Sequence, residues 1–372
     1  MRAIIVSHTY IDPATRGKLK ALVGLGVTLT VAVPARWSPG GRSPLLHSAW
    51  GTDGGVRIVP IPVSGDRGEE VSWKSADLHR LFSDFRPDIL QIEAEPWTPA
   101  AATASARAEK LGIPIVIFGS ESVVRPFTFL ERWRRRRTLA RARALVGGNR
   151  LAAALLGRDR PGIPVTVIPQ LGLTPPLESK RPDHGELAIG FVGRLVPEKG
   201  LDALFRACVK LLGRWHLTVV GSGPSQEMFE ALAERLGIAS RITWRGALPP
   251  EELKRLWPEI DCLVVPSRTT GHWVETFHPA LVEAMGHGVP VVGTDSGTLP
   301  EVIDTAGLVV PEDDIAALTA ALQHLTDAPR ERIRLGKESR LRVMREYVDD
   351  AVARRTLEFW DSVLKPRQAH GG

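Results

Sequence analysis

Short apolar runs alternate with longer stretches of helical spacing along most of this chain, and that alternation constrains the fold more than any single motif. In the first half, the apolar runs Ala3–Ser7, Thr28–Pro34 and Ile89–Glu93 are separated by helical patterns such as Thr98–Leu111. Short apolar runs bounded by turn residues predict buried strands, and strands that alternate with helices predict a parallel sheet with helices on both faces. The pattern therefore predicts an α/β fold.

A stretch rich in proline and glycine, Pro161–Pro176, interrupts the alternation, which restarts at the apolar run Leu187–Val192. Such punctuation marks a domain boundary, and 372 residues suit two domains of ordinary size. We therefore expect two doubly wound, Rossmann-like domains, with residues 1–170 in the first and residues 171–345 in the second. Ligands of open α/β sheets bind beyond the carboxyl ends of the strands, so we expect the domains to face each other across a ligand-binding cleft.

The cysteines and the lengths of the apolar runs exclude several classes of protein. Cys208 and Cys262 are the only cysteines, and both lie in apolar runs, which predicts reduced core residues instead of a disulfide framework or a zinc site. The amino-terminal apolar run is too short for a signal peptide, and the uncharged run Ala21–Ala35 is too short to cross a bilayer. We therefore expect a cytoplasmic protein.

Two carboxylates lie eight positions apart: Glu275 precedes a short predicted helix, Ala280–His287, and Glu283 lies inside it. Pro279 suits the first position of that helix, and Gly288 suits the left-handed position just beyond its end. If the segment were helical throughout, the two carboxylates would be about 12 Å apart. The free N–H groups of the helix start lie between them and favour an oxygen-rich or anionic ligand. The segment could therefore span a ligand with two hydroxylated ends and a negative middle.

Two basic residues follow the strand Leu187–Val192. The strand ends at Gly193, Arg194 comes directly after it, and Lys199 opens the next helix. Cations at the carboxyl end of a strand, beside a helix start, can bind a diphosphate, although two solvated side chains are an equal alternative. Gly297 lies in a turn after a later strand, which offers either N–H groups to a phosphate or a plain helix cap.

Seven arginines and Trp133 lie between residues 132 and 143, and the whole chain carries a net charge of +6. A solvated helix face is the first interpretation of this run. Peripheral contact with an anionic membrane is the second, because Phe129 and Leu130 lie close by. Nucleic acid is the least favoured partner, because no recognised nucleic-acid-binding motif accompanies the charge, and we expect none.

Four segments, GRLVPEKG, VVGSGP, ETFHPALVEAMGHGVPVV and DSGTLPEVI, occur in this order between residues 187 and 307. Together they resemble the family-4 retaining glycosyltransferases, which have the GT-B fold. The resemblance implies a nucleotide-diphospho-sugar donor bound by the second domain, and a carboxy-terminal helix, residues 346–372, that crosses back to the first. It implies that Arg194, Lys199 and Glu275 are catalytic and that Gly193, Glu283, Phe277, His278, Pro279, Gly17, Arg16 and Gly297 bind the donor. The family commonly has glycine where this chain has His278.

The first domain resembles the family less. Many relatives carry a Gly-Gly loop after the first strand, and here Arg16, Gly17 and Lys18 would replace it, unless they form an ordinary surface loop. Many relatives also have a histidine where this chain has Ser120 and Glu121. We expect the acceptor to be bound by four residues, each of which could instead cap a helix or lie in solvent: Glu93, Glu95, Ser120 and Glu121.

The function expected from these features is transfer of a sugar from a nucleotide-sugar donor to an acceptor hydroxyl, with retention of anomeric configuration. The acceptor is open: a lipid, a glycan or a small molecule. No Asp-x-Asp motif in a metal-binding context is present, so we expect no cofactor and no metal. The alternatives are a nucleotide-sugar 2-epimerase of the same architecture and a non-catalytic nucleotide or polyanion binder. The protein would be cytoplasmic, or peripheral at the inner face of the membrane.

Overall fold

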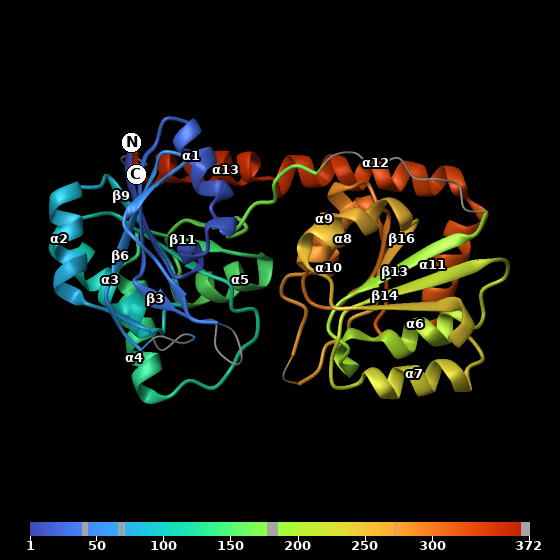
Figure 1. The fold of residues 1–372 in the computed structure, drawn as a ribbon. Helices are drawn as coiled ribbons and strands as arrows, with labels where there is room; N and C mark the ends of the chain where they lie inside the picture. The colour runs from blue at the N-terminus through green and yellow to red at the C-terminus, as the bar shows by residue number, and fades with distance from the viewer. Residues whose placement is uncertain (39–43, 66–67, 69–70, 177–184, 272, 366–372) are drawn as a thin grey trace, which may run out of the picture. The chain divides into compact units, whose positions relative to one another are not determined.

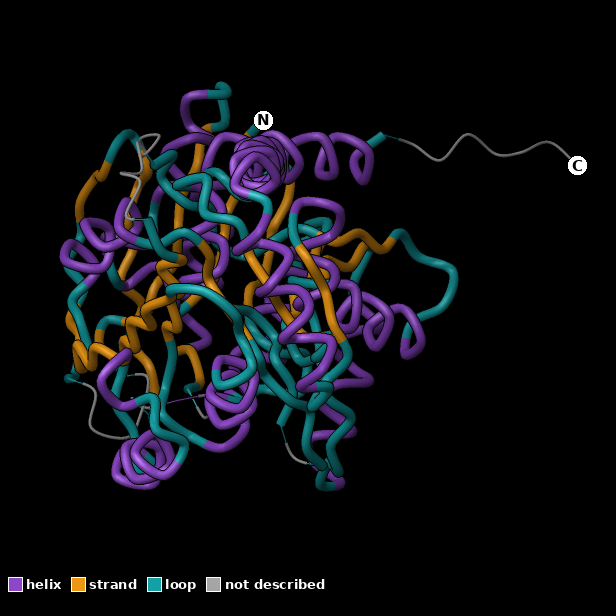
Figure 2. The backbone as a smooth tube through the Cα atoms, turned by 90° about the vertical axis from the view of Figure 1, so that its right-hand side faces the viewer, coloured by secondary structure: helices purple, strands orange, loops and turns teal. Residues whose placement is uncertain are grey.

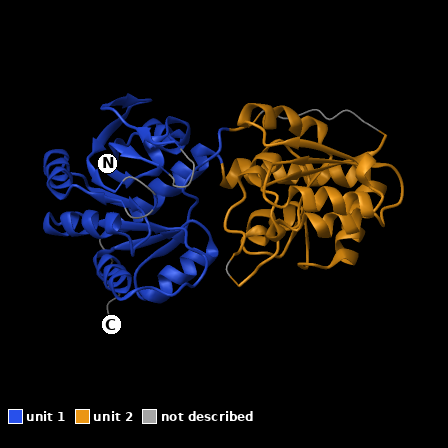
Figure 3. Ribbon diagram, turned by 60° about the horizontal axis from the view of Figure 1, so that its bottom comes forward, with its two compact units in different colours: residues 1–174, 348–372 blue, residues 175–347 orange. Residues whose placement is uncertain are grey.

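The structure is a computed structural model that describes residues 1–38, 44–65, 68, 71–176, 185–271 and 273–365. The chain divides into two compact units, as Figures 1 and 3 show. Unit 1 contains Met1–Thr174 and Val348–Gly372, and unit 2 contains Pro175–Tyr347. Strands and helices alternate along both (Figure 2). The predicted α/β fold with two Rossmann-like units is confirmed.

Unit 1 is built on an eight-stranded sheet with the order β12-β11-β10-β9-β1-β2-β6-β5, in which only the edge strand β5 is antiparallel to its neighbour. The strands are β1 Arg2–Ser7, β2 Thr28–Pro34, β5 Gly51–Asp53, β6 Val56–Ile61, β9 Ile89–Glu93, β10 Ile115–Gly119, β11 Ala144–Gly147 and β12 Val165–Val167. Two small antiparallel pairs join β3 Arg36–Trp37 to β4 Leu46–His47 and β7 Val63–Ser64 to β8 Ser72–Trp73.

Both faces of this sheet are buried, because successive side chains of β1 enter two different cores. Ala3 and Ile5 pack with α1 and α13, whereas Ile4 and Val6 pack with the helices of the other face. The first face is covered by α1 Gly17–Gly24 and α13 Asp349–Leu364, and the second by α2 Ser75–Phe85, α3 Pro99–Lys110, α4 Phe129–Arg141 and α5 Arg150–Asp159. The last helix of the chain therefore belongs to unit 1; residues 366–372 of the expected carboxy-terminal helix lie outside the described residues.

Unit 2 is built on an all-parallel six-stranded sheet with the order β15-β14-β13-β16-β17-β18. Numbered within the unit, this is the order 3-2-1-4-5-6 of a Rossmann sheet, which reverses between β13 and β16. The strands are β13 Leu187–Val192, β14 Trp215–Val220, β15 Ile242–Gly246, β16 Cys262–Val265, β17 Val291–Thr294 and β18 Leu308–Val310. The helices are α6 Leu201–Cys208, α7 Gln226–Arg235, α8 Pro250–Leu256, α9 Pro279–Gly286, α10 Leu299–Ile303, α11 Ile315–Asp327 and α12 Pro329–Glu346.

The stretch Pro161–Pro176, which we interpret from the sequence as a domain boundary, also contains the strand β12. Pro164 and Pro169 flank β12 without entering it, and β12 pairs only with β11 at the edge of the sheet, where prolines are tolerated. The units meet in sequence after Thr174 and after Tyr347, where we expected boundaries after residues 170 and 345.

Cys208 and Cys262 are both buried and do not form a disulfide, as predicted. Among the described residues, we find no helix that combines the length and the apolar character needed to span a membrane.

Candidate functional site

The loops that follow β13 and β16 meet at the point where the strand order of unit 2 reverses. The two strands are neighbours in register, with Gly190 opposite Leu263, so their carboxyl ends open side by side. Gly200 has φ +68, and a Cβ on it would lie 1.8 Å from the carbonyl oxygen of Pro266. Only glycine allows this contact. The close approach brings Lys199, which precedes Gly200, to the loop that follows β16.

Lys199 and Glu275 form an ion pair in this place. Nζ of Lys199 lies 2.5 Å from Oε2 of Glu275, and the hydroxyl of Ser267 donates to the same oxygen at 2.8 Å. The Glu275 side chain is 4% exposed and that of Lys199 is 14% exposed. The ammonium also lies 5.0 Å from the centre of the Trp273 ring. The two predicted catalytic residues are thus in direct contact at the carboxyl edge of the sheet.

His278 is the N-cap of α9 and is buried beside this pair. Its Nδ1 accepts a hydrogen bond from the Leu281 N–H at 3.1 Å, a role usually filled by Asn, Asp, Ser or Thr. Burial and, to a lesser extent, the nearby Lys199 ammonium lower the pKa of His278 to about 4. The imidazole is therefore neutral at pH 7. Pro279 is the first residue of α9, and Gly288 has φ +76, both as predicted.

The main chain of Glu275 is held by the turn between β17 and α10. Gly297 has φ +53, and a Cβ there would lie 2.1 Å from the carbonyl oxygen of Glu275. The Thr298 N–H donates to that carbonyl at 2.9 Å, and the Thr298 hydroxyl donates to it at 3.2 Å. Gly297 thus positions Glu275.

The other predicted donor residues of unit 2 lie in the loop that follows β13, just before α9, or on α9 itself. Arg194 is exposed, and its guanidinium has no hydrogen-bond or ion-pair partner among the described residues. Phe277 is also exposed. Glu283 lies on α9, where burial raises the pKa of its carboxyl group and the Trp257 indole and Lys254 oppose that shift. Gly193 donates its N–H to Val220 at 2.9 Å, but a Cβ on it would meet no atom closer than 3.7 Å. The protein's own packing does not require glycine there.

The basic loop of unit 1 is built differently from the expected phosphate-binding loop. Arg16 is buried, and its guanidinium donates to the carbonyls of Tyr10 and Ile11 and pairs with Asp53 at 3.2 Å. A Cβ on Gly17 would lie 2.0 Å from a carboxylate oxygen of Asp349. In the described structure Arg16 and Gly17 hold this loop to its neighbours.

Glu93, which we expect from the sequence to contact the acceptor, is instead buried and hydrogen-bonded to other side chains of the protein. It lies at the end of β9, 1% exposed, and its Oε1 accepts from Lys18 at 2.7 Å and from Gln91 at 2.8 Å. Its Oε2 accepts from Gln170 at 3.1 Å, and Gln91 in turn accepts from the Trp360 indole at 2.8 Å. This buried network ties α1 and α13 to the sheet, so we do not propose an acceptor role for Glu93.

The remaining three predicted acceptor residues come together at the carboxyl ends of β9 and β10. Oε1 of Glu95 accepts from the N–H groups of Ser120 and Glu121 at 2.6 and 2.9 Å, and from the Ser120 hydroxyl at 3.2 Å. Glu121 pairs with Arg125 at 2.8 Å. Ser120 is exposed. The cluster presents hydroxyl and carboxylate groups at the edge where an α/β sheet binds ligands.

Sequence reasoning missed Ser267 as part of the site. Its hydroxyl reaches Glu275, its side chain is fully buried, and its carbonyl accepts a hydrogen bond from the Thr294 hydroxyl. The available signal was its place directly after Pro266 at the end of a buried strand. A serine there carries no motif of its own.

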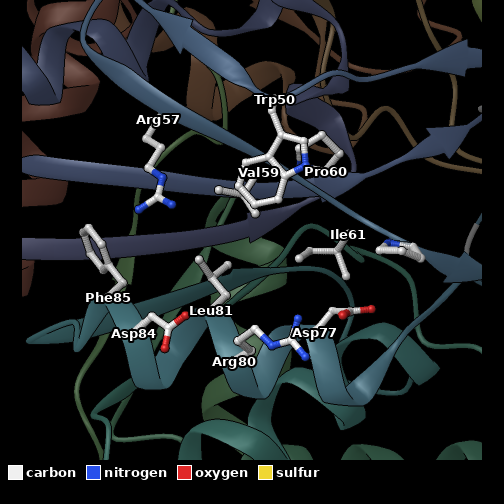
Figure 4. A pocket seen from close by; sticks show the side chains of 11 residues that line it. Trp50, Arg57, Val59, Pro60, Ile61, Asp77, Arg80, Leu81, Asp84 and Phe85 are labelled. Carbon is white, nitrogen blue, oxygen red and sulfur yellow. The ribbon is translucent and has the colours of Figure 1, made fainter.

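A separate pocket of about 300 Å³ lies between β6 and α2 in unit 1 (Figure 4). Its lining includes Trp50, Arg57, Pro60, Asp77, Arg80 and Phe85. None of the predicted site residues lines it. Across the described ranges, no group of three or more His, Cys, Asp or Glu side chains is arranged to hold a metal ion.

Two compact units with parallel sheets, the second with the strand order 3-2-1-4-5-6, have the architecture of the GT-B fold. Residues 186–328 match the family described as glycosyl transferases group 1. The match covers most of unit 2 and ends before α12.

Individual proteins resemble the chain to different extents. A GDP-mannose-dependent alpha-(1-6)-phosphatidylinositol monomannoside mannosyltransferase of Mycolicibacterium smegmatis is 36% identical over 40% of this chain and 41% of its own length. A 2-deoxystreptamine glucosyltransferase of Streptomyces kanamyceticus is 28% identical over 79% of this chain and 84% of its own. The alignment with the mycobacterial relative therefore spans well under half of that protein.

Solved structures resemble the whole chain in fold. The Anabaena protein HepE, in complex with UDP, superposes with a TM-score of 0.71 over 97% of this chain and 100% of its own, at 15% identity. At this identity the likeness shows the fold alone.

Proposed function

We propose that the protein transfers a glycosyl group from a nucleoside-diphosphate sugar to an acceptor hydroxyl with retention of anomeric configuration. The observation that carries this proposal is the contact of Lys199 with Glu275 at the switch point of the unit 2 sheet. A cation and a carboxylate side by side match a substrate with a diphosphate next to a hydroxylated sugar. The GDP-mannose in the name of the mycobacterial relative and the UDP in the Anabaena structure support a nucleotide-sugar donor.

Lys199 and the exposed, unpaired Arg194 would bind the diphosphate of the donor. The bond between the sugar C1 and the β-phosphate oxygen breaks, and negative charge develops on that phosphate. Fixed cations stabilise this charge more in the transition state than in the ground state, which is the condition for catalysis. The open space over Gly193 would let the phosphates approach the main chain closely. We propose that these cations suffice and that no metal is required.

The Glu275 carboxylate would orient the sugar by accepting hydrogen bonds from the sugar hydroxyls, and Glu283 would bind the ribose. The acceptor oxygen forms its bond to C1 on the face from which the diphosphate departs, and its proton passes to the departing phosphate. Phe277, His278 and Pro279 would shape the sugar pocket at the start of α9. Glu95, Ser120 and Glu121 are the proposed acceptor contacts in unit 1. The protein would be cytoplasmic and would contact an anionic membrane peripherally through residues 132–143.

A panel of nucleotide sugars tests the proposal. We expect one donor to raise the melting temperature and to be slowly hydrolysed to its nucleoside diphosphate when no acceptor is added. Isomerised donor without release of nucleoside diphosphate would show the rival 2-epimerase. Stabilisation without any turnover, including turnover with added candidate acceptors, would leave only the non-catalytic binder.

A further inference from the structure

The helix α4 (Figure 1) presents an outer face of unusual composition. At about 100° per residue, one arc of about 160° holds every exposed side chain of the helix. The arc contains Phe129, Leu130, Arg132, Trp133, Arg136, Arg137 and Ala140. We call this arc, together with the preceding Val123 and Val124, the α4 surface.

The α4 surface carries large apolar side chains that are exposed to solvent. Phe129 is 82% exposed, Trp133 and Leu130 are each 49% exposed, and Val124 is 66% exposed. Phe129 and Trp133 are one turn apart and form a short stripe. Single exposed apolar residues are ordinary, but a contiguous group marks a surface that binds something apolar.

Basic side chains flank the stripe. Within the described residues, Arg132 and Arg136 have no carboxylate partner, and Arg137 contacts only the Trp133 ring, 5.4 Å from its centre. Two arginines outside this arc have carboxylate partners instead: Arg135 pairs with Asp159 at 2.6 Å and Arg141 with Glu109 at 2.7 Å.

The helix offers no free acid to neutralise this surface. Glu131, the one acidic residue of α4, points to the inner side, where it pairs with Arg125 at 3.0 Å and closes a capping box with Thr128. These interactions lower the pKa of its carboxyl group to about 2. Residues 129–143 hold seven arginines against one glutamate, a net of +6 that equals the charge of the entire chain. The excess charge of the protein is thus concentrated here.

We infer that the α4 surface binds an anionic phospholipid bilayer and that the acceptor is a lipid of that bilayer. Exposed Phe, Leu and Trp insert at the acyl boundary, while arginines beside them pair with anionic headgroups. A nucleic-acid surface would not need an aliphatic and aromatic stripe that faces solvent.

The acceptor part of this inference rests on the proposed function and on continuity along the chain. The segment that carries Val123 and Val124 begins at Ser120 and Glu121, two of the proposed acceptor contacts. Arg125 lies 4.2 Å from the centre of the Trp97 ring and 4.4 Å from that of Phe127, which fixes this segment to the residues that follow β9. A bilayer bound at the α4 surface would present lipid headgroups beside that cluster.

Co-sedimentation with vesicles tests the surface without any donor, so its outcome does not depend on glycosyl transfer. We expect the protein to bind vesicles that contain phosphatidylglycerol and not vesicles of phosphatidylcholine alone. The triple variant Arg132→Glu, Arg136→Glu, Arg137→Glu should bind about a hundredfold more weakly. The variant Phe129→Ser, Trp133→Ser should also bind at least about tenfold more weakly with all charges kept.

The matched control is Arg206→Glu, Lys210→Glu, Arg235→Glu, which makes the same change of charge at exposed positions of unit 2. It should bind anionic vesicles almost as the wild type does. Equal loss in the control and the α4 variant would reduce the effect to net charge and overturn the inference. Failure of the wild type to bind anionic vesicles, or tight binding to duplex DNA or RNA in their place, would also overturn it. If the protein binds vesicles but glycosylates only water-soluble acceptors, membrane binding by the α4 surface is supported and the lipid acceptor is refuted.

Discussion

The ammonium of Lys199 lies 2.5 Å from Oε2 of Glu275, and both side chains are largely withdrawn from solvent. A pair of this kind costs desolvation energy, and the loss of one partner leaves the other as an uncompensated buried charge. In the ligand-free protein the two residues neutralise each other. A bound diphosphate would add negative charge beside the lysine, and a bound sugar would add hydroxyl groups beside the glutamate. Their separate contributions to stability and to activity can therefore be distinguished.

Lys199→Ala should remove most of the transferase activity and also lower the free energy of unfolding by about 3 kcal/mol, because it leaves Glu275 without its cation. Adding Glu275→Gln to this variant should restore most of the stability while activity stays lost. Urea unfolding and donor turnover measure the two effects. A double variant no more stable than Lys199→Ala would show that the pair is not coupled as described.

Ser267→Ala should act through Glu275, because the lost hydroxyl donates to the carboxylate at 2.8 Å. We expect kcat to fall about tenfold, since the carboxylate loses one of its two fixed donors, with a cost in stability of about 1 kcal/mol. Ser267→Thr, which keeps the hydroxyl, should recover part of the activity. If Ser267→Ala turned over donor as fast as the wild type, the hydroxyl would have no positioning role.

Gly297→Ala should displace Glu275, because its Cβ would lie 2.1 Å from the Glu275 carbonyl oxygen. We expect activity to fall by about a hundredfold, as a misplacement of about 1 Å can do. Gly237→Ala is the matched control, because Gly237 has φ +69 and a Cβ added to it would meet no atom within 4 Å. The control should show only the cost of a left-handed alanine, about 1 kcal/mol of stability. Equal activities in the two variants would contradict this account.

The sequence predicted the ends of a helix well where the residues at those ends determine them. The helix α9 starts at Pro279 and is followed by a left-handed Gly288, as their backbone preferences require. The contact of Lys199 with Glu275, 76 positions apart, was expected only as proximity in a site, since no spacing rule sets such a distance.

Burial gives two of the expected site residues partners that the sequence does not predict. Glu93, at the end of a strand, was expected to bind the acceptor, and Arg16 was expected to replace the Gly-Gly loop of the family. The structure buries both, and their partners Lys18 and Asp53 are far enough away in sequence that no local pattern connects them. Such long-range pairing depends on the sheet order, which the alternation of strands and helices does not specify.

Excess chelator should leave donor turnover unchanged if Lys199 and Arg194 supply the positive charge that the diphosphate needs. The measurement is turnover after dialysis against EDTA, with and without added magnesium. Loss of activity that magnesium restores would refute the proposal that no metal is required. Loss that magnesium does not restore would point to damage of the protein, which a melting curve would reveal.

The buried His278 should make the protein less stable as the pH falls. Its pKa is about 4 in the folded state against 6.5 in the unfolded state, so the unfolded chain binds more protons between these values. The free energy of unfolding should therefore be at its full value above pH 6.5 and decrease as the pH falls towards about 4. This histidine should contribute roughly 3 kcal/mol to the decrease.

His278→Asn isolates that contribution, because the asparagine side chain can still accept the Leu281 N–H at the start of α9 but does not titrate. Urea unfolding between pH 7 and pH 4 should give a shallower loss of stability in the variant. The loss should not vanish, because burial also lowers the pKa of His8 to about 4. Parallel curves for the wild type and His278→Asn would mean that His278 is accessible enough to protonate in the folded protein, contrary to its buried position beside Lys199.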